Sequence, residues 1–328
     1  MFLLTAVFAS FLANMSITGQ SAAHVLAPPQ RIHLFDEGRL SRPFIYNLQK
    51  HRAPETLALT YTEDTSRKYH LRFFVRGFSY RFLWVIPSDL HLFGVEEGGR
   101  LSLLGTDTLG RDLYSRLLIG GQVSLSVPFV GVGLSMLIGT ILGVISGYFG
   151  GRVDHYIQRS IEILLSFPSL PLWMALAAAM PVTMASTTRY VLIVVILSLI
   201  GWGSLARVVR GKVLQYRGEE YVAAAEMSGA GLRRIIFRHL IPGTLSHLIV
   251  SATLGIPGMI LGESSLSFLG VGITPPLTSW GLLLSDAQKT EVLVNHQWLM
   301  IPGLLITVIV LAFNFFGDGL RDAADPYA

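Results

Sequence analysis

The sequence predicts an all-α membrane protein with six transmembrane helices and a polar insert between the first two. Of the 328 residues, 51% are hydrophobic and only 14% are charged, whereas a soluble domain has roughly 25% charged residues. Half of the charged residues lie between Arg31 and Arg116. The rest of the chain contains uncharged windows long enough for a hydrocarbon core, which takes about 20 residues of helix.

Six apolar segments are expected to cross the bilayer as helices, because lipid leaves no partner for an unpaired backbone group. The first belongs to residues 1–27 and is short. Since no basic residue precedes Phe2–Ala13, we expect a transmembrane helix lacking its first turns, with a cleaved signal peptide as the alternative. The other five spans are expected at 121–148, 161–180, 189–207, 244–268 and 298–316.

Two of these spans carry residues that shape helices. Five glycines of the second span are placed for close helix approach: Gly131, Gly133, Gly139, Gly143 and Gly147. The third span carries Pro168 and Pro171 in its first half. These prolines either kink the helix or mark its entry, and the sequence leaves both readings open.

Residues 28–120 are expected to form an extracytoplasmic segment. Pro28 and Pro29 end the first helix, because proline removes a backbone donor and favours extended chain before it. Within the segment, Tyr69–Val75 interleaves apolar and polar residues as strands do. We therefore expect a small external domain with some β structure.

The short loops set an expected orientation. The connection 207–242 is rich in arginine, and the turn before the third span adds Arg152 and Arg159, whereas the opposite loops hold only Arg189 and Lys289. Basic short loops favour the cytoplasm. Residues 121–328 are thus expected to form a permease-like bundle with a cytoplasmic loop at 208–243 and both termini inside.

Several function classes are excluded by composition and motif. The chain has no cysteine, so thiolate catalysis and cysteine-ligated zinc are absent. There is no phosphate-binding glycine-rich loop followed by lysine, and no zinc-protease helix motif. The basic residues flank apolar spans rather than clustering with aromatics, which argues against nucleic-acid binding. We therefore expect no catalytic residue and no metal site.

The basic connection has an unusual composition. Residues 219–231 predict a short alanine-rich helix. Because alanine side chains are small, a partner protein can approach the backbone of this helix closely. Gly229 and Gly231 can adopt left-handed conformations that end such a helix. A basic amphipathic helix and a proline stop at Pro242 are expected to follow.

This connection resembles the EAA loop of ABC importer permeases, which reads EAA, three residues, Gly, nine residues and I-x-L-P. Ala224, Ala225, Gly229 and Pro242 match, whereas Ala223 stands where the family usually has glutamate. The resemblance implies that about 219–231 docks on an ATPase subunit and transmits its closure. The residues assigned to coupling on this basis are Glu219, Glu220, Ala223, Ala224, Ala225, Glu226, Gly229, Arg233, Arg234 and Pro242.

Other segments resemble the C-type subunits of the oligopeptide and dipeptide permeases. Residues 105–116 are similar to their GTDxxGRDxxSR signature, 147–154 to their GYxGGxxD turn, and 263–270 and 317–326 to later segments. The motif residues singled out are Gly105, Asp107, Gly110, Arg111, Asp112, Arg116 and Glu263. The charged residues of 105–116 either bind substrate or form a local ion-pair network, and we favour the network. Glu263 is expected to pair with a neighbouring subunit or to cap its helix, and a functional role inside the span is the alternative.

The resemblance implies a six-helix subunit of the type I importer kind, in the inner membrane of a bacterium or archaeon. It would translocate di- or oligopeptides delivered by an extracytoplasmic substrate-binding protein. A homologous B-type permease subunit and two ATP-binding subunits would complete the transporter, and ATP and magnesium would bind only to those ATPases. Nickel chelates or oligosaccharides are alternative cargoes, and an ion-coupled secondary transporter is an alternative class.

Overall fold

The computed structural model describes residues 2–36, 38–52, 59–82, 85–288 and 290–324. These residues form two compact units, one made of 1–125 and 273–305 and the other of 126–272 and 306–328. Lys289 and the last two residues of the 317–326 motif lie outside the described residues.

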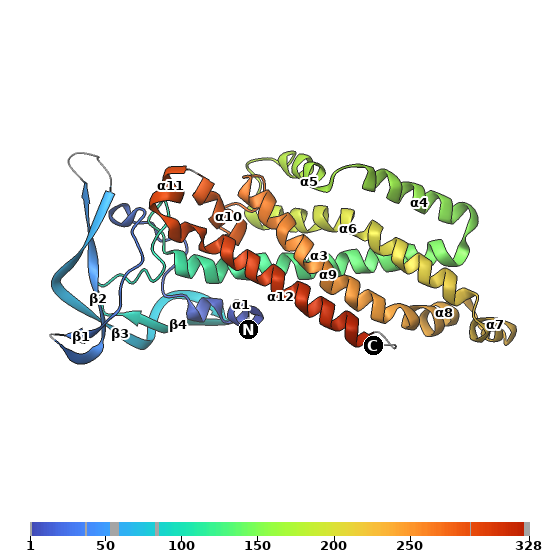
Figure 1. Cartoon of the computed structure of the whole chain (residues 1–328), viewed down its shortest axis with the longest axis horizontal. Coiled ribbons are helices and arrows are strands. Elements are labelled where there is room, and N and C mark those ends of the chain that lie inside the picture. The colour runs from blue at the N-terminus through green and yellow to red at the C-terminus, as the bar shows by residue number, and fades with distance from the viewer. Residues whose placement is uncertain (1, 37, 53–58, 83–84, 289, 325–328) are drawn as a thin grey trace. The chain divides into compact units, whose positions relative to one another are not determined.

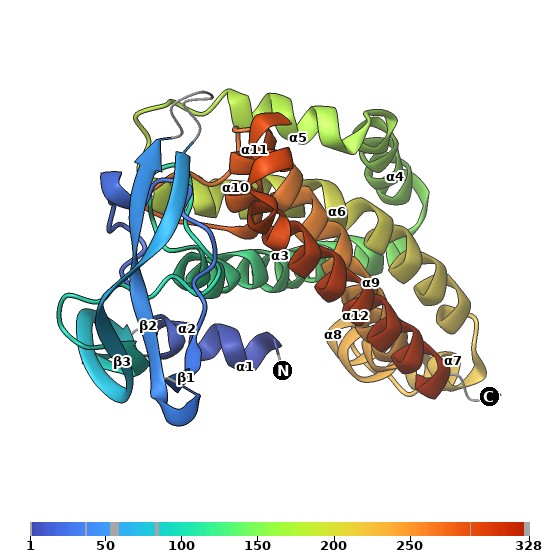
Figure 2. The same cartoon turned by 60° about the vertical axis from the view of Figure 1, so that its left-hand side comes forward.

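The first unit contains a four-stranded antiparallel sheet with the strand order β1-β2-β3-β4 (Figures 1 and 2). Its strands are β1 (His33–Asp36), β2 (Arg39–Arg52), β3 (Leu59–Phe82) and β4 (Ile86–Val95). The expected β structure is confirmed, since Tyr69–Val75 lies within β3. The all-α class therefore holds only for the membrane part of the chain.

The sheet has two sections because β3 changes partner along its length. Its first part pairs with β2, with Leu59 opposite Arg52, and its second part pairs with β4, from Leu71 opposite Val95 to Phe82 opposite Ile86. The core of the sheet is small and includes Ile45, Tyr69 and Leu101. The second part is thus a two-stranded ribbon, named here the β3–β4 ribbon (71–82 and 86–95).

Short helices complete the first unit. They are α1 (Phe2–Val7), α2 (Ala9–Leu12), α10 (Trp280–Ser285) and α11 (Thr290–Asn295), with single 3₁₀ turns at Ala22–His24, Asp286–Gln288 and Gln297–Met300. The expected first span is thus two helices of 6 and 4 residues. At 1.5 Å per residue neither crosses a bilayer by itself.

The second unit is helical. Its helices are α3 (Leu113–Phe149) and α12 (Ile301–Ala324), which both begin in the first unit, together with α4 (Gly151–Ser166), α5 (Ser169–Ala178), α6 (Ser186–Arg217), α7 (Glu220–Met227), α8 (Leu232–Ile235) and α9 (Ile241–Phe268). Four stretches in the described part are long and apolar enough to span a membrane: 113–149, 186–217, 232–268 and 297–323. The prediction of six spans is therefore not confirmed.

The expected third span is broken. α4 and α5 meet at an angle of 84° and count as one further candidate span only if taken together. α4 ends because Phe167 precedes Pro168, and a residue before proline is driven out of the helical region; its backbone is extended, with ψ 137°. Pro168 then stands as the N-cap of α5, so the prolines mark a sharp bend followed by helix entry.

Close contact between α3 and α6 rests on glycine. A Cβ added at Gly139, Gly143 or Gly147 would come within 3.0 Å of a backbone oxygen of α6. Spaced four residues apart, these glycines form one ridge on α3. Gly131 lies as tightly against Met259, but Gly133 has open space around it, so the expectation is wrong for Gly133.

Candidate functional site

The alanine-rich segment forms α7, a helix of eight residues that follows the end of α6 (Figure 1). Its end is a Schellman motif: the Ala230 N–H donates to the Ala225 carbonyl at 3.0 Å, and the Gly229 N–H donates to the Glu226 carbonyl at 2.9 Å. Gly229 has φ +77°, which side-chain-bearing residues rarely adopt. Gly231 has φ −68° and begins α8, so the expectation of a left-handed Gly231 is wrong.

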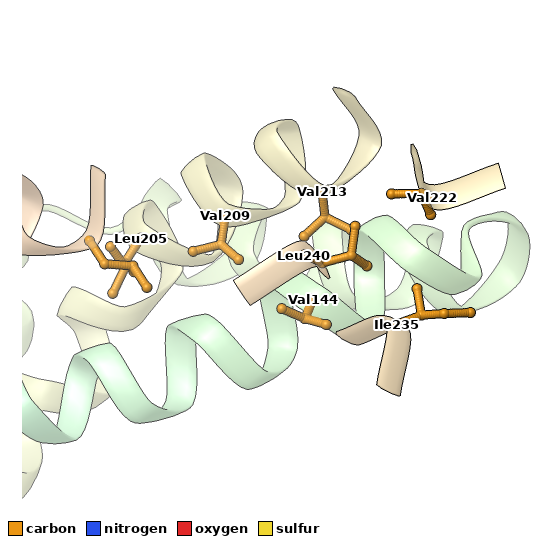
Figure 3. Packing of buried hydrophobic residues seen from close by; sticks show 8 residues of the cluster. Val144, Leu205, Val209, Val213, Val222, Ile235 and Leu240 are labelled. Carbon is orange, nitrogen blue, oxygen red and sulfur yellow. The ribbon is translucent and has the colours of Figure 1, made fainter. Parts of the chain in front are cut away.

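One side chain fastens α7 to the bundle. Val222 is fully buried in a hydrophobic cluster and points toward Val213, Leu240 and Ile235 (Figure 3). The cluster also contains residues of α3, α6 and α9: Val144, Leu205, Val209 and Leu248. α7 is therefore joined through this cluster to three of the candidate spans.

The rest of α7 and its surroundings are exposed. Ala225 is half-buried, and the other residues assigned to coupling are exposed: Glu219, Glu220, Ala223, Ala224, Glu226, Gly229, Arg233, Arg234 and Pro242. Met227 is 87% exposed and Phe237 is 70% exposed. Small, acidic, basic and apolar side chains thus share one accessible segment.

Pro242 does not stop a helix, contrary to the prediction. The helix runs from Leu232 to Phe268, and a π turn at Ile236–Leu240 precedes the proline. The Ile241 N–H donates to the Ile236 carbonyl, five residues earlier. A proline has no N–H and its ring crowds the carbonyl four residues back, so the wider turn lets the helix pass it.

Two side chains that the sequence analysis did not assign to coupling support α7. The Tyr148 hydroxyl lies 3.4 Å from Glu226 Oε1. The guanidinium of Arg217 donates to the Tyr148 carbonyl at 2.8 Å and lies over its ring. Tyr148 belongs to the glycine-rich turn 147–154, so the sequence motif marked this residue. Its contact with α7 depends on tertiary structure and could not be read from the motif.

The motif at 105–116 lies in the first unit. Its charged residues form an ion-pair network, which is the alternative that the sequence favoured over substrate binding. Asp107 is fully buried and accepts hydrogen bonds from the Leu109 and Arg111 N–H groups, each at 2.9 Å. Its other oxygen binds Arg111 Nε at 2.7 Å and Arg116. Two basic side chains and two amides therefore neutralise one buried carboxylate.

The backbone conformation of this motif requires glycine at two of its turn positions. Gly105 and Gly110 have φ +76° and +69°, and a Cβ at Gly110 would lie 2.1 Å from the Ser21 carbonyl oxygen. Asp112 accepts a hydrogen bond from the Ser115 N–H at 2.7 Å at the start of α3. Burial raises the pKa of Asp112 to about 6. Burial also raises the pKa of Asp286, which lies 3.7 Å from Arg116.

Glu263 lies within α9, in the second unit, and is fully buried. It accepts a hydrogen bond from the hydroxyl of Ser267, one helical turn later, at 2.6 Å. The same unit has a cavity of about 320 Å³ with walls from α3, α5, α6 and α9. Its lining is mostly apolar, with three serine hydroxyls, and includes Ser135, Trp173, Ser204, Ser251 and Met259.

Comparison with known proteins gives the class of the chain. The family model described as the binding-protein-dependent transport system inner membrane component matches residues 139–327. The oligopeptide transport system permease protein OppC of Haemophilus influenzae is 46% identical, over 68% of this chain and 69% of its own length. The dipeptide transport system permease protein DppC of Bacillus subtilis is 36% identical, over 86% and 92%.

A solved structure of the MetNI methionine ABC transporter in inward-facing conformations is similar with a TM-score of 0.46 and 18% identity, over 63% of this chain and 94% of that chain. This likeness supports no conclusion on its own. By the family model and the two relatives, the chain belongs to the family of inner membrane components of binding-protein-dependent transport systems, as a multi-pass, non-catalytic permease subunit that works with an ATPase and a binding protein.

Proposed function

We propose that this chain is the permease subunit of an ATP-driven importer of di- and oligopeptides, with α7 receiving the motion of the ATPase. The names of the OppC and DppC relatives support the cargo. The observation that supports the coupling role is the way α7 packs on the rest of the helical unit. The residues of α7 are exposed except for the half-buried Ala225 and for Val222, which is buried in a cluster with residues of α3, α6 and α9.

The mechanism follows from that packing. ATP and magnesium bind to two partner ATPase subunits, and this chain holds neither. When the ATPases close, they push on the exposed side of α7. Val222 passes the displacement to Val213 on α6 and to Leu240, which directly precedes α9, because close-packed side chains transmit movement rather than absorb it.

The cavity of about 320 Å³ lies among the helices that this push would move. We therefore place part of the substrate path there. Its small and apolar lining residues suit a passage that accepts peptides with different side chains. A wall built from α3, α5, α6 and α9 changes shape when those helices shift.

The complete transporter would contain a homologous B-type permease subunit, two ATPase subunits and an extracytoplasmic substrate-binding protein. In this arrangement both termini and the loop 208–243 are cytoplasmic, and residues 28–120 are extracytoplasmic. Six spans result if α4 and α5 form one broken span and Phe2–Leu12 belongs to the first. The arginine-rich connection 207–242 supports this orientation.

The coupling role is tested with a matched pair of substitutions. Gly229→Val places a β-branched residue at φ +77°, which such residues avoid. Gly231→Val is the control, because Gly231 has φ −68° and nothing within 4 Å of its Cβ position. In the reconstituted transporter, we expect G229V to abolish uptake and the binding-protein stimulation of ATP hydrolysis, whereas G231V retains both. Equal coupling in the two variants would reject α7 as the coupling helix.

The cargo is tested separately, in proteoliposomes that contain the whole transporter. Uptake of radiolabelled trialanine is compared with uptake of a nickel–histidine chelate and of maltotriose, each with and without ATP. We expect ATP-dependent uptake of trialanine only. Uptake of the chelate or sugar alone would replace the peptide assignment, and uptake driven by an ion gradient without ATPase subunits would replace the transporter class.

A further inference from the structure

We propose that the end of the β3–β4 ribbon, formed by Phe82, Val85 and Ile86, rests in the headgroup layer of the bilayer that surrounds the chain. This gives the insert a lipid contact that goes beyond its place in an importer. The partner of this surface is the lipid leaflet on the same side of the membrane as the insert. The start of α3, α1 and the ribbon all belong to the first unit.

α1 lies against the first turns of α3, which belong to a candidate span. Gln122 Nε2 on α3 donates to the Ala6 carbonyl at 2.9 Å. A pocket between the two helices is lined by Phe2, Thr5, Leu117 and Gly121. No residue of α3 is charged between Arg116 and Arg152. This part of the helix is therefore compatible with the hydrocarbon core of a bilayer.

The remaining surface of α1 is apolar and uncovered. Leu3, Leu4 and Val7 are 48%, 64% and 44% exposed. No charged residue precedes Arg31 in the sequence. A helix with this composition, lying beside a membrane span, presents these side chains to lipid.

The β3–β4 ribbon packs on α2, the helix that directly follows α1, and on Phe8 between the two helices (Figure 1). The ring of Phe82 lies 5.5 Å from that of Phe8, between their centroids, and the ring of Phe74 lies 6.5 Å from that of Phe11. The ribbon end is therefore at the level of residues that face lipid. This continuity is what favours lipid over a protein partner.

The exposed side chains of the ribbon end suit a membrane surface. Val85 and Ile86 are 76% and 56% exposed. Arg81 is exposed and has no acidic partner among the described residues, although Arg72 pairs with Glu96 at 2.6 Å and Arg76 with Asp89 at 4.0 Å. The apolar side chains can contact lipid acyl chains, and the neighbouring Arg81, which has no acidic partner in the described part of the chain, can bind a lipid phosphate group.

The depth of insertion is limited by the backbone. Among the described residues of the ribbon, β3 and β4 pair only with each other, so the outer edge of each strand lacks a neighbouring strand. Such edges are not tolerated in hydrocarbon. The ribbon end can therefore enter the headgroup layer and the first carbons of the acyl chains, but it cannot cross the core.

The test uses single cysteines, since the chain has none of its own. Val85→Cys in the full transporter is labelled with bimane and reconstituted into vesicles, either with lipids spin-labelled near the top of the acyl chain or with unlabelled lipids. Thr62→Cys, an exposed position at the opposite end of β3, is the matched control. We expect lipid spin labels to remove most of the fluorescence at position 85 and none at 62, and external iodide to quench position 62 far more.

Quenching of both labels by iodide alone would overturn the proposal. So would an iodide-accessible label at position 85 that becomes protected only when the substrate-binding protein is added, because the surface would then be a protein interface. Trialanine uptake by the same vesicles is recorded in parallel. Loss of the lipid contact with retained uptake rejects this inference alone, whereas uptake that fails in the wild type bears only on the proposed cargo.

Discussion

The carboxylate of Asp154 on α4 binds the guanidinium of Arg210 on α6 through both oxygens, each N···O distance being 2.5 Å. Ser146 on α3 donates to the same carboxylate at 2.5 Å. One acidic side chain therefore joins three helices near the turn at Gly150 and Gly151. Such bidentate pairs hold geometry better than single ion contacts do.

Replacing Asp154 with Asn should loosen this junction. Because the pair is only partly buried, the free energy of unfolding should fall by about 1 kcal/mol. Arg159→Gln is the control, since Arg159 pairs with Glu162 at the surface, and its effect should stay below about 0.5 kcal/mol. Thermal unfolding of the purified protein in detergent measures both. Equal midpoints for D154N and the wild type would contradict the assigned role.

The glycine ridge of α3 gives a second comparison. A Cβ at Gly143 would lie 2.6 Å from the Ala206 carbonyl oxygen of α6, whereas one at Gly133 would meet nothing within 4 Å. Gly143→Ala must push the helices apart and should destabilise the protein by about 1–3 kcal/mol. Gly133→Ala should change stability by less than about 0.5 kcal/mol. A similar loss of thermal stability in both would show that α3 and α6 do not need this contact.

Asp112 predicts a pH dependence of stability. Its carboxyl has the ordinary pKa of 3.8 when unfolded and about 6 when folded. Between those values the folded protein holds a proton that the unfolded chain has released, so raising the pH lowers the free energy of unfolding. The stabilisation, about 3 kcal/mol at roughly 1.4 kcal/mol per pKa unit, is fully present below pH 4 and lost above pH 6.

Asp112→Asn should flatten that part of the curve of unfolding midpoint against pH, measured from pH 4 to 7 in detergent. The difference between the variant and the wild type isolates Asp112 from other acids. The variant keeps a side-chain oxygen to accept the Ser115 N–H. Two parallel curves would mean that Asp112 does not titrate in this range.

Asp107 should be far less tolerant of substitution. Its replacement by Ala leaves Arg111 and Arg116 partly or wholly buried without their shared carboxylate, and breaking a buried pair costs about 3–5 kcal/mol. Asp36→Ala breaks the surface pair with Lys68 and should cost no more than about 1 kcal/mol. The yield and unfolding midpoint of the two variants check this, and equal values would mean that the Asp107 network is dispensable.

The sequence predicted what depends on local composition. Long uncharged windows located the four candidate spans of α3, α6, α9 and α12, and the alanine run located α7. Gly229 was expected to end α7 because a left-handed residue favours glycine. Which of two nearby glycines takes that role is fixed by the hydrogen bonds around Ala225 and Ala230. Gly231 instead begins the next helix, which no local pattern distinguished.

Other features depend on contacts between distant residues. The sequence shows Pro242 but not the π turn that lets the helix pass it. It shows Pro168 but not the 84° angle between α4 and α5. Val222 looks like any valine on an alanine-rich helix, and only the packing of α3, α6 and α9 makes it the anchor. Helix ends also extended past the apolar windows, because charged residues are acceptable in helix that leaves the lipid.

The sheet departs from the rest of the chain at Gln30 and returns at Ser102, and those two residues are bound to each other. The Gln30 N–H donates to the Ser102 carbonyl at 3.0 Å, and the Ser102 N–H donates to the Gln30 side chain at 2.6 Å. An excursion closed at its base in this way adds little ordering entropy when its length changes. The sheet also contacts the rest of the first unit, with the ring of Phe93 5.9 Å from that of Tyr114 at the start of α3 and the ring of Phe82 5.5 Å from that of Phe8. A change in the length of the excursion therefore leaves its base closed, whereas replacing the whole sheet would uncover Phe8 and Tyr114.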